Sequence, residues 1–139
     1  MEKRLEENSD LKASTSVTAT KGGFIVSLAD AGFFDAGEAE LRVEAVPMIT
    51  ALAESLRSSD AMIRVEGHTD SIPISTSRFP SNWELSTARA SKVLSELLAR
   101  GVQSSRLSLA GYAGERPIAD NSTPEGRARN RRVDLVVMQ

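Results

Sequence analysis

The pattern of apolar and polar residues first predicts a β-hairpin near the start of the chain. Two runs rich in β-branched side chains cover residues 16–20 and 24–28. Residues 21–23 between them include two glycines, which favour the backbone of a tight turn. Residues 1–14 lack a sustained apolar stripe, so we expect a linker or marginal helix there and one folded domain over residues 15–139.

An apolar stripe with helical spacing follows the hairpin and predicts an amphipathic helix. Its members are Leu41, Ala45, Met48, Ile49, Leu52 and Leu56. Asp35 and Glu38 resemble a capping box, which marks the start of a helix. Pro47 removes one backbone donor inside this helix, so we expect a kink or a restart near Val46.

Residues 63–68 alternate between apolar or small residues and polar ones, which is typical of a strand with one covered face. The strand ends at Thr69 and Asp70. Residues 71–80 combine two prolines with serine and threonine, a composition that favours an extended surface loop. We therefore expect Asp70 at the edge of a sheet, where this loop begins.

A second helix is predicted after the loop. Ser81 and Glu84 form a capping box at its start, and Gly101 ends it. Its apolar face comprises Ala90, Val93, Leu94, Leu97 and Leu98.

Two more strands and a short helix complete the predicted order of elements. The strands cover residues 107–112 and 133–138, and residues 123–125 resemble the start of a short helix. Helices and loops twice separate one strand from the next, which favours a mixed β-sheet with helices packed on one face. We therefore predict an α/β fold in the form of an α+β sandwich.

The composition agrees with one such core. The chain has 139 residues, 40% of them hydrophobic, which suits one domain better than two. Its net charge of -2 is too small to attract nucleic acid or anionic membranes through a whole-protein field. The absence of cysteine excludes disulfides, thiol catalysis and zinc–thiolate sites. No apolar stretch reaches the ~20 residues that cross a bilayer, so any targeting segment is expected upstream.

Asp70 and Arg89 are the residues whose chemistry suggests a binding site. Asn82, Leu85 and Arg89 are three and four positions apart, so they share one stripe of the second helix. If this helix packs beside the preceding strand, Arg89 can reach Asp70. The pair is then either an exposed ion pair, worth at most ~1 kcal/mol, or a ligand clamp. A clamp suits a free amino-acid end, because a carboxylate accepts from its ammonium and a guanidinium holds its carboxylate through two parallel hydrogen bonds.

The other polar residues do not indicate catalysis. His68 is the only histidine, and we interpret it as structural because no partner for nucleophilic or metal chemistry is evident. Ser86 has no base at hand and is interpreted as an ordinary helix residue. Asp60, Glu66 and Asp70 are scattered without a metal-ligand spacing. We therefore predict that the chain is not an enzyme and has no metal or other cofactor.

Several motifs together resemble the OmpA-like peptidoglycan-binding family. The resemblance covers residues from about 24 to the end. The motifs are the string from Val65 to Asp70, then Asn82, Leu85, Ser86, Arg89 and Ala90, then Gly111, Tyr112 and Pro117, and finally Asn130 to Val133. Within the family, residues 73–76 and 79–86 are similar to the MotB-type flagellar stator proteins, whereas more general members have a shorter, glycine-containing loop there.

The resemblance implies that Asp70 takes the ammonium and Arg89 the carboxylate of diaminopimelate in the peptide stem of peptidoglycan. It also implies supporting contacts from Thr69, from Asn82 and from backbone amides of the loop. Many members carry an asparagine after the first long strand, whereas Ala-Asp-Ala occupies residues 29–31 here. The contact from that side is therefore left open.

A basic run near the C-terminal end has two interpretations. Its members are Arg127, Arg129, Arg131 and Arg132. A nucleic-acid patch is disfavoured because the run lacks interleaved aromatic residues and lies close to Glu125 and Asp134. We favour a solvated helix end from which Arg131 or Arg132 faces the glycan strand or its stem, with no nucleic-acid partner.

The resemblance further implies a non-catalytic anchor in the periplasm. In MotB-type stators this domain holds a membrane ion channel of the flagellar motor to the cell wall. The implied partners are peptidoglycan, a second copy of the chain in a homodimer, and a channel-forming subunit reached through an upstream inner-membrane helix. Two alternatives stay open: a general OmpA-like tether of an outer-membrane protein or lipoprotein, and a peptidoglycan hydrolase that uses the same groove. The loop before Trp83 argues against the first.

Overall fold

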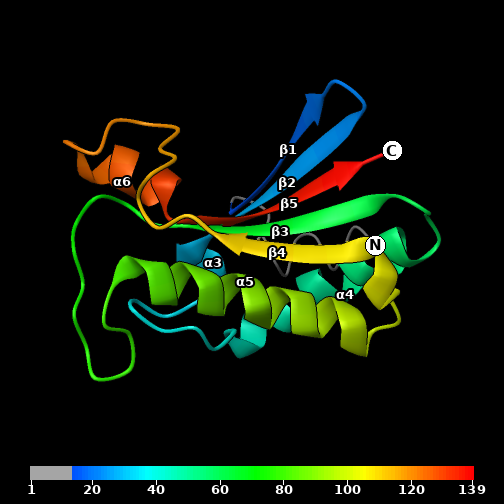
Figure 1. The fold of residues 1–139 in the computed structure, drawn as a ribbon, viewed down its shortest axis with the longest axis horizontal. Coiled ribbons are helices and arrows are strands. Elements are labelled where there is room, and N and C mark those ends of the chain that lie inside the picture. Colours follow the sequence, from blue (N-terminus) through cyan, green and yellow to red (C-terminus); the bar gives the residue numbers. More distant parts are fainter. Residues whose placement is uncertain (1–13) are drawn as a thin grey trace.

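A five-stranded β-sheet forms the centre of the computed structural model, which describes residues 14–139 (Figure 1). Its strands are β1 (Thr15–Thr20), β2 (Gly23–Ala29), β3 (Met62–His68), β4 (Leu107–Gly111) and β5 (Arg132–Met138). Nearly all of the predicted linker over residues 1–14 lies outside the described residues, so the domain boundary stays a prediction.

The sheet is mixed, as predicted. The strand order is β1-β2-β5-β3-β4, in which β3 and β4 run parallel and every other neighbouring pair is antiparallel. The remaining elements are α3 (Asp30–Phe33), η1 (Val43–Ala45), α4 (Val46–Arg57), α5 (Asn82–Ala99), η2 (Ser104–Arg106) and α6 (Pro124–Asn130). Figure 1 shows α4 and α5 side by side beneath one face of the sheet, with α6 beyond the end where β5 begins. This arrangement confirms the predicted fold class.

The hydrophobic core lies between the sheet and these two helices. Successive side chains of a strand point to opposite faces, so alternate residues of β2, β3 and β5 enter the core. The strand residues are Val26, Leu28, Ile63, Val65, Val133, Leu135 and Val137, and the helix residues include Ile49, Ala53, Leu56, Ala90, Val93 and Leu97. The helical stripes predicted from spacing supply the helix side of the core.

The helix start predicted at Asp35 is wrong. Gly37 has a φ of 70°, outside the helical region, and residues 35–42 form a loop. The helix α4 begins instead at Val46, with Pro47 in its first turn, where the missing N–H removes no intrahelical hydrogen bond. The predicted restart near Val46 is therefore confirmed.

The helix α5 begins and ends as predicted. The Ser81 side chain caps it by accepting a hydrogen bond from the Trp83 amide at 3.2 Å, and Glu84 pairs with the same hydroxyl. The helix lies against β3 and β4 and ends at Ala99, just before Gly101.

Strand register brings distant parts of the chain to one edge of the sheet. Arg132, at the start of β5, pairs with Ala29 at the end of β2 and with His68 at the end of β3. Because β5 is antiparallel to both neighbours, its start lies beside the ends of β2 and β3. The residues that follow β2 and β3 therefore meet those that precede β5 at the same edge. Those residues include Asp30 and Asp70.

Candidate binding site

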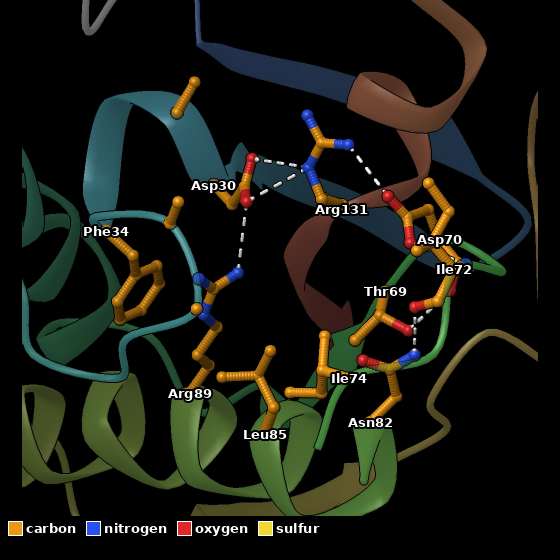
Figure 2. Close-up of a pocket in the computed structure, with 13 residues that line it drawn as sticks. Asp30, Phe34, Thr69, Asp70, Ile72, Ile74, Asn82, Leu85, Arg89 and Arg131 are labelled. Carbon is orange, nitrogen blue, oxygen red and sulfur yellow. Dashed lines mark hydrogen bonds and ion pairs between the residues drawn. The ribbon is translucent and has the colours of Figure 1, made fainter. Parts of the chain in front are cut away.

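A pocket of about 350 Å³ opens at this edge of the sheet (Figure 2). It is lined by Asp30, Ala31, Phe34, Ala36, Gly37, Thr69, Asp70, Ile72, Ile74, Asn82, Leu85, Arg89 and Arg131. All five residues predicted to bind a ligand are among them: Thr69, Asp70, Asn82, Arg89 and Arg131. The structure therefore brings the predicted site residues together, and their contact with a ligand stays a prediction.

Asp70 enters the pocket from the C-terminal end of β3. One carboxylate oxygen accepts a hydrogen bond from the Ile72 amide at 3.0 Å, which starts the following loop as a turn. The other oxygen accepts from Nη1 of Arg131 at 2.9 Å. These two bonds hold the carboxylate in one orientation, and Asp70, which is only 8% exposed, lines the pocket.

Arg89 enters from α5 and is 3% exposed. Its Nε donates to the Glu38 carbonyl at 2.7 Å, and Nη2 donates to the Asp35 carbonyl at 3.2 Å. The guanidinium also lies over the Phe34 ring, 4.8 Å from its centroid. Burial lowers the pKa of Arg89 and the charge of Asp30 opposes this shift, but a guanidinium stays protonated at any physiological pH.

Asp30 is the site residue that sequence reasoning missed. It follows β2 directly, and its carboxylate accepts from Nη1 of Arg89 at 3.2 Å and from Nε of Arg131 at 3.3 Å and 3.4 Å. Figure 2 shows it between the two guanidinium groups. The only signal in the sequence is its place in residues 29–31, where the resemblance implies an asparagine in many members of the family.

Four charged side chains therefore alternate in sign around the pocket, in the order Arg89, Asp30, Arg131 and Asp70. Within the described residues, Asp70 and Arg89 pair with Arg131 and Asp30 and not with each other. The interpretation of Asp70 and Arg89 as an exposed ion pair is thus wrong, since both residues are buried and the pocket separates them. An arrangement of this kind can hold a small ligand that carries both an ammonium and a carboxyl-derived group.

Thr69 and Asn82 shape the pocket wall. The Thr69 hydroxyl donates to the Asp70 carbonyl at 2.8 Å. The Asn82 amide donates to the Ile72 carbonyl at 2.9 Å, which ties α5 to the loop over residues 71–80. Both bonds fix the segment around Asp70, and the supporting contacts with a ligand that the resemblance implies for Thr69 and Asn82 stay a prediction.

The basic run divides between the pocket and the interior. Arg131 lines the pocket, where burial works to lower its pKa but the hydrogen bond with Asp70 and the charge of Asp30 raise it overall. Arg132 is only 6% exposed and binds Asp134 at 3.1 Å. The prediction of a solvated helix end is wrong for Arg132.

A second polar cluster lies on the sheet face opposite α4 and α5. His68 Nε2 is 3.3 Å from a Glu66 oxygen and 3.8 Å from an Asp134 oxygen. The interpretation that His68 lacks a partner for metal chemistry is wrong, because the three groups lie within 4.8 Å of one another. Glu66 also binds Arg64 at 2.6 Å and Asp134 binds Arg132 at 3.1 Å. These guanidinium groups compensate both carboxylates, so the cluster fits an ion-pair network better than a cation site.

Replacing His68 with glutamine should make the protein less sensitive to mild acid. Burial lowers the pKa of His68 below 6.5 and the charge of Arg132 adds to this, while Asp134 and Glu66 oppose it. The unfolded chain therefore takes up the proton first, so the stability that neutral His68 contributes is complete above pH 6.5 and is lost as the pH falls towards the folded-state pKa.

This loss has an upper limit of about 1.4 kcal/mol per pH unit, the value for one proton. Urea unfolding of both proteins between about pH 7.5 and 5 measures it. Equal pH dependence of the wild type and His68→Gln would show that His68 carries none of the effect.

Ser86 is a structural residue of α5, as interpreted from the sequence. Its hydroxyl is buried, donates to the Trp83 carbonyl at 3.1 Å and accepts from the Ala113 amide at 3.1 Å. These bonds hold the segment after β4 against the helix.

The fold and the pocket define an α+β sandwich domain with a pocket lined by charged side chains at one edge of the sheet. The model of the OmpA family matches residues 33–131, and the chain therefore belongs to the OmpA family.

Two Bacillus subtilis proteins match nearly the whole chain. The uncharacterized protein YtxE is 40% identical over 132 residues, which cover 94% of this chain and 54% of YtxE. Motility protein B is 34% identical over 139 residues, covering 99% of this chain and 51% of that protein. The chain thus spans about half the length of these curated relatives.

Solved structures match the fold closely. The cell wall anchor of the T6SS from Pseudomonas aeruginosa has a TM-score of 0.87 and 34% identity, over 98% of this chain and 94% of that one. The periplasmic domain of Helicobacter pylori MotB has a TM-score of 0.83 and 28% identity, over 90% and 82%. These matches confirm the predicted resemblance to an OmpA-like domain of the MotB type. Among residues 14–139, no helix is long and apolar enough to cross a membrane.

Proposed function

We propose that this chain binds peptidoglycan without cleaving it and so anchors a larger assembly to the cell wall. The observation that carries the proposal is the pocket, in which four charged side chains of alternating sign surround a space of about 350 Å³. Proteins similar to the chain over most of its length are a cell wall anchor and a MotB periplasmic domain, and both descriptions agree with a wall-binding role.

The proposed ligand is the diaminopimelate of the peptide stem. Asp70 would accept from its ammonium, since an ionised carboxylate is the natural partner of that group. Arg89 would donate to its carboxyl group with the N–H groups that its three protein partners leave free. Arg131 would hold Asp70 in place, and Thr69 and Asn82 would add supporting contacts with the ligand from the pocket wall.

The site supports binding better than catalysis. Hydrolysis of the wall needs an activated nucleophile or water, and each pocket carboxylate is paired with a guanidinium. His68 faces the other side of the sheet, away from the pocket. We therefore propose that the domain turns over no substrate.

Replacing Asp70 with asparagine should weaken binding to purified sacculi about 10-fold to 100-fold. The substitution keeps the shape but removes the charge that would face the ammonium, and a hydrogen bond to a charged group contributes about 1.5–3 kcal/mol. Co-sedimentation of the protein with sacculi measures the effect.

Asp60→Asn is the matched control, because Asp60 is exposed and lies just before the opposite end of β3. It should sediment like the wild type. Undiminished sedimentation of Asp70→Asn would refute the role of Asp70, and release of soluble muropeptides by the wild type would refute the non-catalytic proposal.

The proposed assembly is a flagellar stator of the MotB type in the periplasm. Similarity to motility protein B along 99% of the chain and to a MotB periplasmic domain supports this assignment. A homodimer, a channel-forming partner subunit and an inner-membrane helix upstream belong to the same proposal. A transmembrane helix with an aspartate, encoded upstream of these residues, would support it.

A second candidate is the wall anchor of a secretion system, favoured by the TM-score of 0.87 to such an anchor. Both candidates put peptidoglycan in the pocket and differ in the machine that is anchored. The two candidates are separated by replacing the matching part of motility protein B with this chain in Bacillus subtilis. Cells that still swim in soft agar would support the stator.

A further inference from the structure

The pair formed by Arg89 and Asp30 gives one end of the pocket a hydrogen-bond donor beside an acceptor. Nη1 of Arg89 lies 3.2 Å from the Asp30 carboxylate, and both residues line the pocket. Arg89 has five N–H groups, of which three bind Asp30 and the carbonyls of Asp35 and Glu38, so two remain for a ligand. Asp30 can only accept, because an ionised carboxylate has no proton to donate.

A ligand carboxylate fits this pair poorly. A ligand carboxylate that accepts from Arg89 lies beside the Asp30 carboxylate, and two like charges this close repel each other. A carboxamide fits well, because its oxygen accepts from Arg89 while its NH₂ group donates to Asp30.

The charges of the pocket agree with this complementarity. Asp30 and Asp70 balance Arg89 and Arg131, so the four side chains carry no net charge. Arg89 already has a buried carboxylate as its partner, and a ligand carboxylate would have to compete with it. A neutral carboxamide joins the pair without breaking it.

We infer that the pocket selects a stem amino acid whose carboxyl group is amidated, and that Asp30 determines this preference. The inference rests on the proposed binding of the peptide stem. Asp70 keeps the ammonium, and the Arg89–Asp30 pair takes the carboxamide.

The test compares two synthetic stem tripeptides that end in diaminopimelate, with the side-chain carboxyl either free or amidated, by isothermal titration calorimetry. The wild type should bind the amidated peptide at least about tenfold more tightly. Asp30→Asn keeps an acceptor for Arg89 and adds a donor, so it should shift the preference at least about tenfold towards the free acid.

Asp35→Asn is the matched control, since the Asp35 side chain is exposed and lies outside the pocket lining. It removes the same charge and should leave the wild-type preference unchanged. Equal affinity of the wild type for both peptides, or tighter binding of the free acid, overturns the inference while the proposed function stands. Failure of both peptides and of sacculi to bind overturns the proposed function itself. A folded Asp30→Asn that keeps the wild-type preference overturns the role of Asp30, and if that variant does not fold, the wild-type comparison still tests the preference for the amide.

Discussion

Replacing Arg89 with alanine should abolish co-sedimentation with sacculi and lower the free energy of unfolding by about 3–5 kcal/mol. Arg89 is 3% exposed, and its side chain is the shared partner of Asp30 and of the Asp35 and Glu38 carbonyls. Its loss leaves two carbonyls without this donor and leaves Asp30 with Arg131 as its remaining cation. Arg89 is therefore expected to act both in binding and in fixing the loop over residues 35–42.

Arg89→Lys separates these two roles. Lysine keeps the positive charge beside Asp30 but has no fork that reaches three acceptors at once. Urea unfolding should show a smaller loss of stability for lysine than for alanine, while sacculus binding should be weak for both. Binding is measured at a temperature at which all three proteins are folded. Full binding by Arg89→Ala would exclude the clamp, and an unchanged unfolding midpoint would exclude the structural role.

The elements that the sequence predicts well are those set by local patterns. The capping residue Ser81 and the terminating Gly101 bracket α5, and the alternation over residues 63–68 marks β3. Helical spacing also puts Asn82, Leu85 and Arg89 on one wall of the pocket. These predictions succeed because each depends on residues that are close together in the sequence.

Asp30 shows where such reasoning ends. It lies 59 positions from Arg89 and 101 from Arg131, and the pairing of β2 with β5 and the packing of α5 against the sheet bring the three together. The partner of His68 on β5 was missed for the same reason. Register between distant strands is set by the whole sheet and has no local signature.

The prediction of where α4 begins failed for a different reason. Asp35 and Glu38 have capping-box spacing, but the left-handed backbone of Gly37 between them prevents a helix. A capping motif is therefore informative only when the residues inside it can adopt helical dihedral angles. The apolar residues assigned to the false first turns still reach the core: Leu41 packs against it from the loop, and Ala45 is buried in η1.

Replacing Gly67 with alanine should lower the free energy of unfolding by about 3 kcal/mol and weaken sacculus binding together with it. An added Cβ would lie 1.9 Å from the Ser86 carbonyl oxygen and 2.7 Å from its carbon, both in the backbone of α5. Backbone atoms cannot swing aside as a side chain does, so the helix must move away from β3. Because α5 carries Asn82 and Arg89, this movement would widen the pocket as well as loosen the core.

Gly22→Ala separates the steric effect from backbone strain. Gly22 has a φ of 90° but has no atom within 4 Å of an added Cβ. Alanine there should cost about 1–2 kcal/mol through strain alone and leave sacculus binding unchanged. Urea unfolding and co-sedimentation of both variants test the contrast. A loss of stability for Gly67→Ala no larger than that for Gly22→Ala would contradict the close approach of α5 to β3 on which the geometry of the pocket depends.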